Sequence, residues 1–235
     1  MTNGTQQRRI AAVALGLALA LAFTLGSATV HAGVWREMME DLHLVKKEPQ
    51  PAQQGGAGPQ ALPRQGFACC NLHFDGDEIN DANYTELPMI PAGTPIEVLS
   101  YGRNDAAIKV DGKPMKLDHK YGRKQETLDA WVSKLVVSED PRQHLSAYPP
   151  VVRSAIEKGQ VVVGMTREQA IAAIGYPLTS ENGPLDGPVW RVWQSRHDEY
   201  QLNFQPGPDG HLTGVTGDES VTSAVTYRPG QLSAR

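Results

Sequence analysis

A complete start and stop for a short helix lies within residues 164–177, which read GMTREQAIAAIGYP. Thr166 can accept a hydrogen bond from the amide of Gln169 while the Gln169 side chain reaches back to Thr166, the reciprocal arrangement called a capping box. Gly175 can adopt the left-handed conformation that ends a helix, and Pro177 prevents its continuation. Because a helix of about ten residues does not recover its nucleation cost in water, this segment needs a partner surface.

The residues around this helix predict the surface that it needs. A second short helix is predicted from Pro150 to Gly159, with apolar residues at helical spacing. Downstream, VWRVWQS and EYQLNFQ are typical of strands, and apolar and polar residues alternate in the second of them. After the turn residues PGPDG, residues 211–215 can return as a third strand. The sequence therefore predicts two helices on the dry face of a three-stranded antiparallel sheet.

The segments IEKGQVVVGMTREQAIAAIGYP, VWRVW, YQLNF and DGHLTGV follow one another in the carboxyl half of the chain. In sequence and order they resemble the SmpA/OmlA family, the small outer-membrane assembly lipoproteins also called BamE. The resemblance implies a two-layer module without catalysis, which acts through protein and lipid contacts within the machine that folds β-barrels into the outer membrane. This chain departs from the family because its first cysteine, Cys69, lies far beyond the amino-terminal apolar run, so no lipoprotein box is present.

Residues 67–137 form an additional section, which reads as strands followed by a helix. In NDAAIKVDGKPMKL, apolar residues alternate on both sides of the tight-turn pair Asp111 and Gly112, which predicts a hairpin. Residues at helical spacing then predict a helix: Leu128, Trp131, Val132 and Leu135. The run PAGTPIEVL, followed by the hairpin, resembles the opening of bacterial Src-homology-3-like barrels and implies a small β-barrel of the kind used as a binding module. An unclassified β-rich domain is the alternative.

The predicted fold class is therefore α+β. A small β-barrel-like, Src-homology-3-like domain with a carboxyl-terminal helix occupies residues 67–137, and a BamE-like domain of two helices and three antiparallel strands occupies residues 138–217. Residues 218–235 are predicted to be a flexible tail.

The amino terminus has the layout of a secretory signal. Arg8 and Arg9 precede an uncharged apolar run, and Val30 and Ala32 place small side chains before a cleavage site, so residues 1–32 are predicted to be a signal peptide. Retention of this run as an anchor is the alternative, although the run is shorter than the roughly 20 residues that span a bilayer. We expect an exported protein in the periplasm or at the periplasmic face of the outer membrane.

Two segments separate the predicted signal from the first domain. Residues 33–48 place apolar side chains along one side and are predicted to form a short amphipathic helix, which docks on the body of the protein or contacts a membrane surface. Residues 49–66 are rich in proline, glycine and glutamine, a composition that predicts a linker.

The charge of the chain argues against a nucleic-acid partner. The formal net charge is −4, and removal of the predicted signal, which carries two arginines and no acidic residue, makes it −6. Binding to nucleic acid needs clustered lysine and arginine. The one small basic cluster is interpreted as a solvated loop: His119, Lys120, Arg123 and Lys124.

The two cysteines of the chain are adjacent, at Cys69 and Cys70, and His73 lies three positions beyond. This spacing is not that of haem attachment, and one cysteine pair is too few for a structural zinc site. In an oxidising compartment the pair can form a vicinal disulfide, bridge to another chain or remain as buried thiols. A structural role is favoured, with Cys69, Cys70 and His73 as weak candidates for a metal or redox site. The sequence predicts no catalytic residue and no cofactor.

These patterns favour a non-enzymatic cell-envelope protein linked to outer-membrane assembly or envelope integrity. We expect it to bind other envelope proteins, including the barrel-assembly machinery of the outer membrane, through sheet edges or exposed loops. Two alternatives remain open. One is a periplasmic protein inhibitor, because the two-helix, sheet-backed module also resembles the repeats of β-lactamase inhibitory proteins. The other is a redox or metal-handling protein that uses Cys69, Cys70 and His73.

Overall fold

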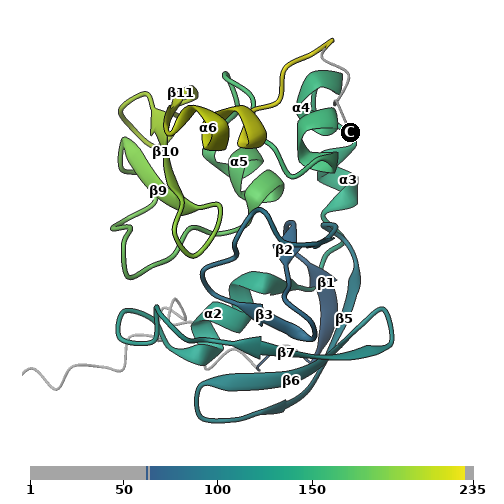
Figure 1. Ribbon diagram of the computed structural model, residues 1–235. Helices are drawn as coiled ribbons and strands as arrows, with labels where there is room; N and C mark the ends of the chain where they lie inside the picture. The colour runs from purple at the N-terminus through teal and green to yellow at the C-terminus, as the bar shows by residue number, and fades with distance from the viewer. Residues whose placement is uncertain (1–61, 63, 231–235) are drawn as a thin grey trace, which may run out of the picture. The chain divides into compact units, whose positions relative to one another are not determined.

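The structure is a computed structural model, which describes residue 62 and residues 64–230. These residues form a mixed α+β fold with two parts, which we call the β lobe (residues 64–137) and the helical lobe (residues 138–230) (Figure 1). The α+β class predicted from the sequence is confirmed at this level.

Several predictions for the amino-terminal region fall on residues that the structure does not describe. The signal peptide (1–32), the amphipathic helix (33–48) and most of the linker (49–66) lie outside the described residues. The last two residues assigned to the linker, Gln65 and Gly66, instead begin a strand, because they pair with the strand that starts at Pro95. Among the described residues, no helix combines the length and apolar character needed to cross a membrane.

The β lobe is built on a curled six-stranded sheet in the order β3-β7-β6-β5-β1-β8 (Figure 1). All neighbours are antiparallel except β3 and β7, which run parallel. A short separate ladder joins β2 and β4, and helix α2 shares the core of the sheet. The elements of this lobe are β1 (Gln65–Ala68), β2 (Leu72–His73), β3 (Glu78–Asn80), β4 (Met89–Ile90), β5 (Pro95–Tyr101), β6 (Asp105–Val110), β7 (Lys113–Asp118), α2 (Leu128–Leu135) and β8 (Val136–Val137).

The predicted hairpin and helix of this lobe are confirmed. Strands β6 and β7 are joined by Asp111 and Gly112, whose positive φ angles of 48° and 78° give the tight turn that glycine favours at its second position. The four apolar residues at helical spacing in α2 are all buried against the sheet: Leu128, Trp131, Val132 and Leu135. The amphipathic pattern therefore identified the buried face correctly.

The helical lobe places short helices on a three-stranded antiparallel sheet in the order β11-β10-β9. The two predicted helices and three predicted strands are all present. The elements are α3 (Arg142–Leu145), α4 (Pro150–Glu157), α5 (Arg167–Ile174), β9 (Val189–Trp193), β10 (Glu199–Phe204), β11 (Leu212–Gly217) and α6 (Glu219–Val225).

Helix α5 has the start and stop that the sequence predicts. Thr166 and Gln169 form both hydrogen bonds of the capping box. Gly175 ends the helix with φ 78° and ψ −177°, which is a glycine conformation but not the left-handed helical one expected. A side chain at Gly175 would collide with the Asn83 amide, so the β lobe as well as the turn requires glycine here.

The helices lie on the dry face of the sheet, as predicted. One hydrophobic core contains the alternating residues Tyr200, Leu202 and Phe204 of β10 together with the buried residues of α4 and α5. Ile171 of α5 packs against this core and also against the core of the β lobe. The two cores therefore meet at one helix.

The prediction of a flexible tail over residues 218–235 is wrong for its first part. Helix α6 begins after the cap of Asp218, and its residues Val221 and Val225 are buried in the core of the helical lobe. Tyr227 then donates its backbone N–H to the carbonyl of Val161. The spacing of the two valines, four residues apart, was the sequence signal for this helix.

Arg167 is a buried cation that fastens the loops at one end of the helical lobe. Its guanidinium stacks on the ring of Phe204 at 4.6 Å and donates to backbone carbonyls on both flanking loops. The full set of acceptors comprises Gly207, Pro208, Gly210, Asp186, Gly187 and Gln205. A planar fork of donors suits this role, because it reaches several carbonyls at once.

Two asparagines of the β lobe join it to the helical lobe. Asn71, which is 1% exposed, donates from Nδ2 to the carbonyls of Ile156 (2.7 Å) and Ala173 (2.8 Å) at the ends of α4 and α5. Its Oδ1 accepts from the backbone N–H of Ala92, and its own backbone N–H donates to Ala172. Carbonyls in the last turn of a helix have no partner within the helix, so the bonds to Ala172 and Ala173 satisfy groups that burial would otherwise leave unpaired, whereas the Ile156 carbonyl also accepts from the backbone N–H of Gly159.

Asn83 repeats this contact one residue further along α5. Its Nδ2 donates to the carbonyl of Ile174 at 2.7 Å, while its Oδ1 accepts from the backbone N–H of His73 at 2.7 Å. Nearby, the backbone N–H groups of Thr85 and Glu86 donate to the chain that leaves β9. The two lobes are therefore joined by buried hydrogen bonds as well as by packing.

We expect Asn71→Ala to lower the free energy of unfolding by at least about 3 kcal/mol, because each buried backbone group that it leaves unpaired costs about 1–3 kcal/mol. Asn203→Ala is the matched control, since Asn203 makes an exposed hydrogen bond to Thr216. Its loss should change the free energy by less than about 0.5 kcal/mol. Urea unfolding of both variants measures the difference, and equal midpoints would contradict this role for Asn71.

Candidate functional site

The two cysteines lie where the β lobe meets the helical lobe. They directly follow β1, and the structure joins Cys69 and Cys70 by a disulfide. Cys70 is fully buried in the core of the β lobe, whereas Cys69 is half-buried. The backbone N–H of Cys69 donates to the carbonyl of Leu135 at the end of α2. One sulfur of the pair therefore faces a surface, while the other belongs to the core.

His73 has a different environment from the cysteines. Its ring is 3% exposed, and Nδ1 lies 2.8 Å from the carbonyl of Leu87. Because a carbonyl only accepts, Nδ1 carries the hydrogen, and the buried Nε2 has no hydrogen-bond partner among the described residues. Burial lowers the pKa of His73, although its hydrogen bond to Leu87 acts in the opposite direction. Within the described ranges, no group of three or more His, Cys, Asp and Glu side chains is placed to hold a metal ion.

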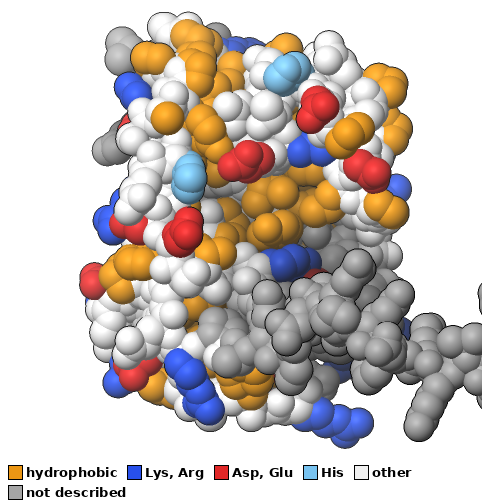
Figure 2. All heavy atoms as spheres, turned by 180° about the vertical axis from the view of Figure 1, so that it is seen from behind, with side chains coloured by type: hydrophobic (Ala, Val, Ile, Leu, Met, Phe, Trp, Pro, Cys, Tyr) orange, Lys and Arg blue, Asp and Glu red, His pale blue; other side chains and the backbone are white. Residues whose placement is uncertain are grey.

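An apolar hollow of about 400 Å³ opens beside Cys69, at the junction of the lobes. We call it the junction hollow. Its apolar lining comes from both lobes: Cys69, Val137, Leu145, Tyr148, Ile171 and Tyr176. On the face seen in Figure 2, apolar side chains gather between the two lobes, with acidic, basic and histidine side chains around them. A hollow of this size is at the small end of ligand sites, which measure about 300–1,000 Å³.

Acidic groups stand at the border of the junction hollow. Glu168, in the first turn of α5, accepts a hydrogen bond from the Tyr148 hydroxyl at 3.0 Å, and Glu139 lies exposed after β8. Burial is the main cause that raises the pKa of Tyr148 to about 12, and the hydrogen bond to Glu168 contributes to the same shift. Burial also raises the pKa of Tyr176, with a further contribution from the negative charges of Glu126 and Glu168.

Two basic side chains lie near this border: His144 lines the hollow, and Lys134 is already paired. Lys134 lies over the ring of Tyr176 at 5.0 Å and forms an ion pair with Glu126 at 2.7 Å. Among the described residues, neither Glu139 nor Glu168 has a basic partner within ion-pair distance. The border of the junction hollow therefore has a surplus of negative charge.

The edges of the three-stranded sheet are less open than the sequence led us to expect. On the outer side of β9, Asn182 accepts from the backbone N–H of Arg191 and donates to its carbonyl, as a neighbouring strand would. On the outer side of β11, Leu212 exchanges backbone hydrogen bonds with Gly164 and Met165. Strand addition is blocked at these positions, because the edge groups already have partners.

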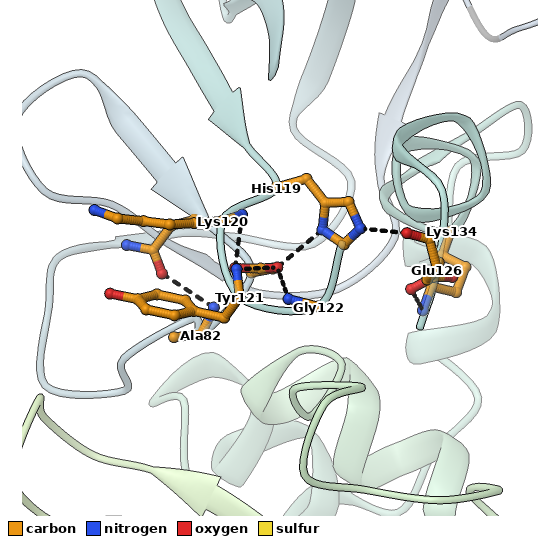
Figure 3. Close-up of polar contacts among 9 residues, drawn as sticks. Ala82, His119, Lys120, Tyr121, Gly122, Glu126 and Lys134 are labelled. Atoms are coloured by element: carbon orange, nitrogen blue, oxygen red, sulfur yellow. Dashed lines mark hydrogen bonds and ion pairs between the residues drawn. The ribbon is translucent and has the colours of Figure 1, made fainter. Parts of the chain in front are cut away.

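The largest departure from the sequence reading is at Asp81 and His119. His119 was expected in a solvated loop, but its ring is 1% exposed and its Nδ1 lies 2.8 Å from Asp81 Oδ2 (Figure 3). The other ring nitrogen, Nε2, lies 2.9 Å from the carbonyl of Glu126, and the ring stacks on Trp131. The three basic neighbours are exposed as expected: Lys120, Arg123 and Lys124.

Asp81 organises the loop that follows β7. Its carboxylate accepts the backbone N–H groups of Lys120, Tyr121 and Gly122 in addition to the His119 ring. The pairing could not be read from the sequence, because Asp81 and His119 are 38 residues apart and no motif connects them. Although an Asp–His pair resembles part of a catalytic triad, both nitrogens of His119 are engaged and the ring is buried, so the arrangement is structural.

The sequence reading also missed the residues of the junction hollow other than Cys69. Tyr148, Glu168 and Tyr176 were not singled out. No local pattern marks them, because the hollow exists only once the lobes are joined.

No family model matches the sequence, and no curated protein or solved structure matches this chain at a significant level.

We expect the stability of the protein to fall on acidification through His73. The pKa of His73 is lower in the folded state than its ordinary value of about 6.5, so below that pH the unfolded chain takes up a proton before the folded protein does. The stabilisation is complete above about pH 6.5 and is lost as the pH falls, with a limiting slope of about 1.4 kcal/mol per pH unit. Asn in place of His73 retains a donor for Leu87 but does not titrate. Urea unfolding between pH 8 and pH 5 should show a steeper decline for the natural protein than for His73→Asn; parallel curves would contradict this assignment.

We expect Asp81→Asn to lower the free energy of unfolding by about 3 kcal/mol, because the new NH₂ group faces buried donors and the His119 pair is broken. Asp75→Asn is the control, since Asp75 makes an exposed ion pair with Arg196 at 3.9 Å. That change should cost less than about 1 kcal/mol. Chemical unfolding at pH 7 compares the two, and a similar small effect at both sites would be inconsistent with the role given to Asp81.

Proposed function

We propose that this protein is a non-enzymatic cell-envelope interaction protein, linked to outer-membrane assembly or envelope integrity, which binds its partner at the junction hollow. The observation that carries the proposal is an apolar hollow lined by both lobes, where Ile171 connects the two cores. Apolar surface in a concave site is the usual mark of an interaction surface. The junction bonds of Asn71 and Asn83 support a rigid, preformed site.

We further propose that the two lobes are a Src-homology-3-like domain and a BamE-like domain. The support for the first is the curled sheet with its β6–β7 hairpin. The support for the second is the order of α4, α5 and three antiparallel strands, together with the capping box at Thr166. An export signal at residues 1–32, without a lipoprotein box, supports a site of action in the periplasm or at the periplasmic face of the outer membrane.

A redox role is the second candidate. The observation that favours it is the half-buried disulfide sulfur of Cys69 at the wall of the junction hollow, where a partner's thiol would reach it. In that case the partner would depend on Cys69 and Cys70 rather than on the apolar lining.

Site-specific photo-cross-linking in intact cells tests the proposed function. A photoreactive phenylalanine at Tyr148 should cross-link to an envelope protein, with components of the barrel-assembly machinery as the expected products. The control is the same photoreactive phenylalanine in place of Tyr121, which is 41% exposed on the β lobe and does not line the hollow. Absence of cross-links at Tyr148, or the same products from both positions, would count against the junction hollow. Loss of all products in a Cys69→Ser, Cys70→Ser variant would favour the redox role.

A further inference from the structure

We infer that the junction hollow takes a polypeptide segment that places an apolar or aromatic side chain next to a lysine or arginine. This inference rests on the function proposed above, and it specifies the chemistry of the partner. It combines two properties of the hollow, its apolar lining and its acidic border.

The apolar lining determines the anchor of the partner segment. Ile171 and Tyr176 form part of one wall, and Cys69 and Val137 contribute from the β lobe. All four side chains are half-buried, so an incoming apolar side chain would remove both its own surface and theirs from water. Burial of one leucine or phenylalanine side chain strengthens binding by roughly tenfold to a hundredfold. A volume of about 400 Å³ suits a few side chains rather than a folded domain.

The acidic border determines the charge next to that anchor. Glu139 and Glu168 stand on two sides of the lining, one after β8 and one at the start of α5. Lys134 does not offset them, because Glu126 already pairs with it, and His144, which also lines the hollow, forms no ion pair with either glutamate. The Tyr148 hydroxyl holds Glu168 in place through a hydrogen bond of 3.0 Å, which reduces the ordering cost when a cation binds. Lysine or arginine beside the anchor is the complement of this arrangement.

The same charges disfavour other occupants. An anionic lipid surface or nucleic acid would bring negative charge against Glu139 and Glu168. A second copy of the chain, related by a twofold axis through the hollow, would place the acidic border against itself. A basic, apolar segment of another protein avoids both conflicts.

Two short synthetic peptides of equal length test the inference with the purified protein. Both alternate leucine or phenylalanine with a charged residue, which is lysine in one peptide and glutamate in the other. Fluorescence anisotropy should show binding of the lysine peptide, at least about tenfold tighter than the glutamate peptide, and weaker binding as salt is raised. Failure of the lysine peptide to bind would overturn the inference.

Variants distinguish the contribution of the acidic border to peptide binding from that of the apolar lining. Glu139→Gln and Glu168→Gln should each weaken binding of the lysine peptide by about two- to fivefold. Glu157→Gln, at an exposed carboxylate on α4 that does not line the hollow, should leave it unchanged. Tyr176→Ala should weaken the binding of both peptides. Because that variant also alters packing, its thermal unfolding is measured as a control. In a separate experiment, a photoreactive form of the lysine peptide is cross-linked to the natural protein, and cross-links are expected at Tyr148 or Tyr176.

The outcomes distinguish this inference from the proposed function. If both peptides bind equally and only Tyr176→Ala weakens them, the hollow binds protein but the charge assignment is wrong. If cross-links of the lysine peptide fall elsewhere, the inference fails, while the cell-based cross-links at Tyr148 still decide the proposed function. Self-association that Glu139→Gln strengthens and Tyr176→Ala removes would identify a second copy as the occupant and overturn the inference.

Discussion

The structure depends on the hydrogen bonds that four backbone carbonyls at the ends of α4 and α5 accept from the β lobe. Each helix is too short to be stable alone, and each ends against the β lobe, where water is excluded. The side chains of Asn71 and Asn83 donate to three of these carbonyls, and the backbone N–H of Asn71 donates to the fourth. The Ile156 carbonyl also accepts from the backbone N–H of Gly159, so the other three carbonyls are the ones that depend on the β lobe. Each unpaired carbonyl in this position would cost about 1–3 kcal/mol, so the helices and the β lobe stabilise one another.

The contact of α4 and α5 with the β lobe also explains the position of the candidate site. The chain runs from β1 through the disulfide directly into Asn71, so Cys69 is held beside α5 by the same contact that ends the helix. Ile171 also lines the hollow and packs against both cores. The junction hollow is therefore a product of the interface between the lobes, and neither lobe would form it alone.

Much of the fold could be predicted from the sequence, because it depends on interactions between residues that are close in the chain. The capping box at Thr166, the turn at Asp111 and Gly112, and the alternation through Tyr200 were predictable because each depends on neighbouring residues. The contacts of Asn71 and the pairing of Asp81 with His119 were not, because their partners are 21 to 102 residues away and polar side chains carry no periodic signal. Helix α6 was missed for another reason: its two buried valines make too short a pattern to outweigh the polar residues around them. The candidate site belongs to the part that could not be predicted, apart from Cys69.

The long span between Asn71 and its acceptors has a consequence for how the chain reaches its final form. During synthesis, Asn71 emerges 85 residues before Ile156 and 102 residues before Ala173. The β lobe, which ends at Val137, is thus complete in sequence 19 residues before Ile156 and 36 residues before Ala173, whose carbonyls pair with the Asn71 amide. Until α4 and α5 are synthesised, the face that they will cover is exposed to water, and the nascent protein can meet chaperones before it reaches its final topology.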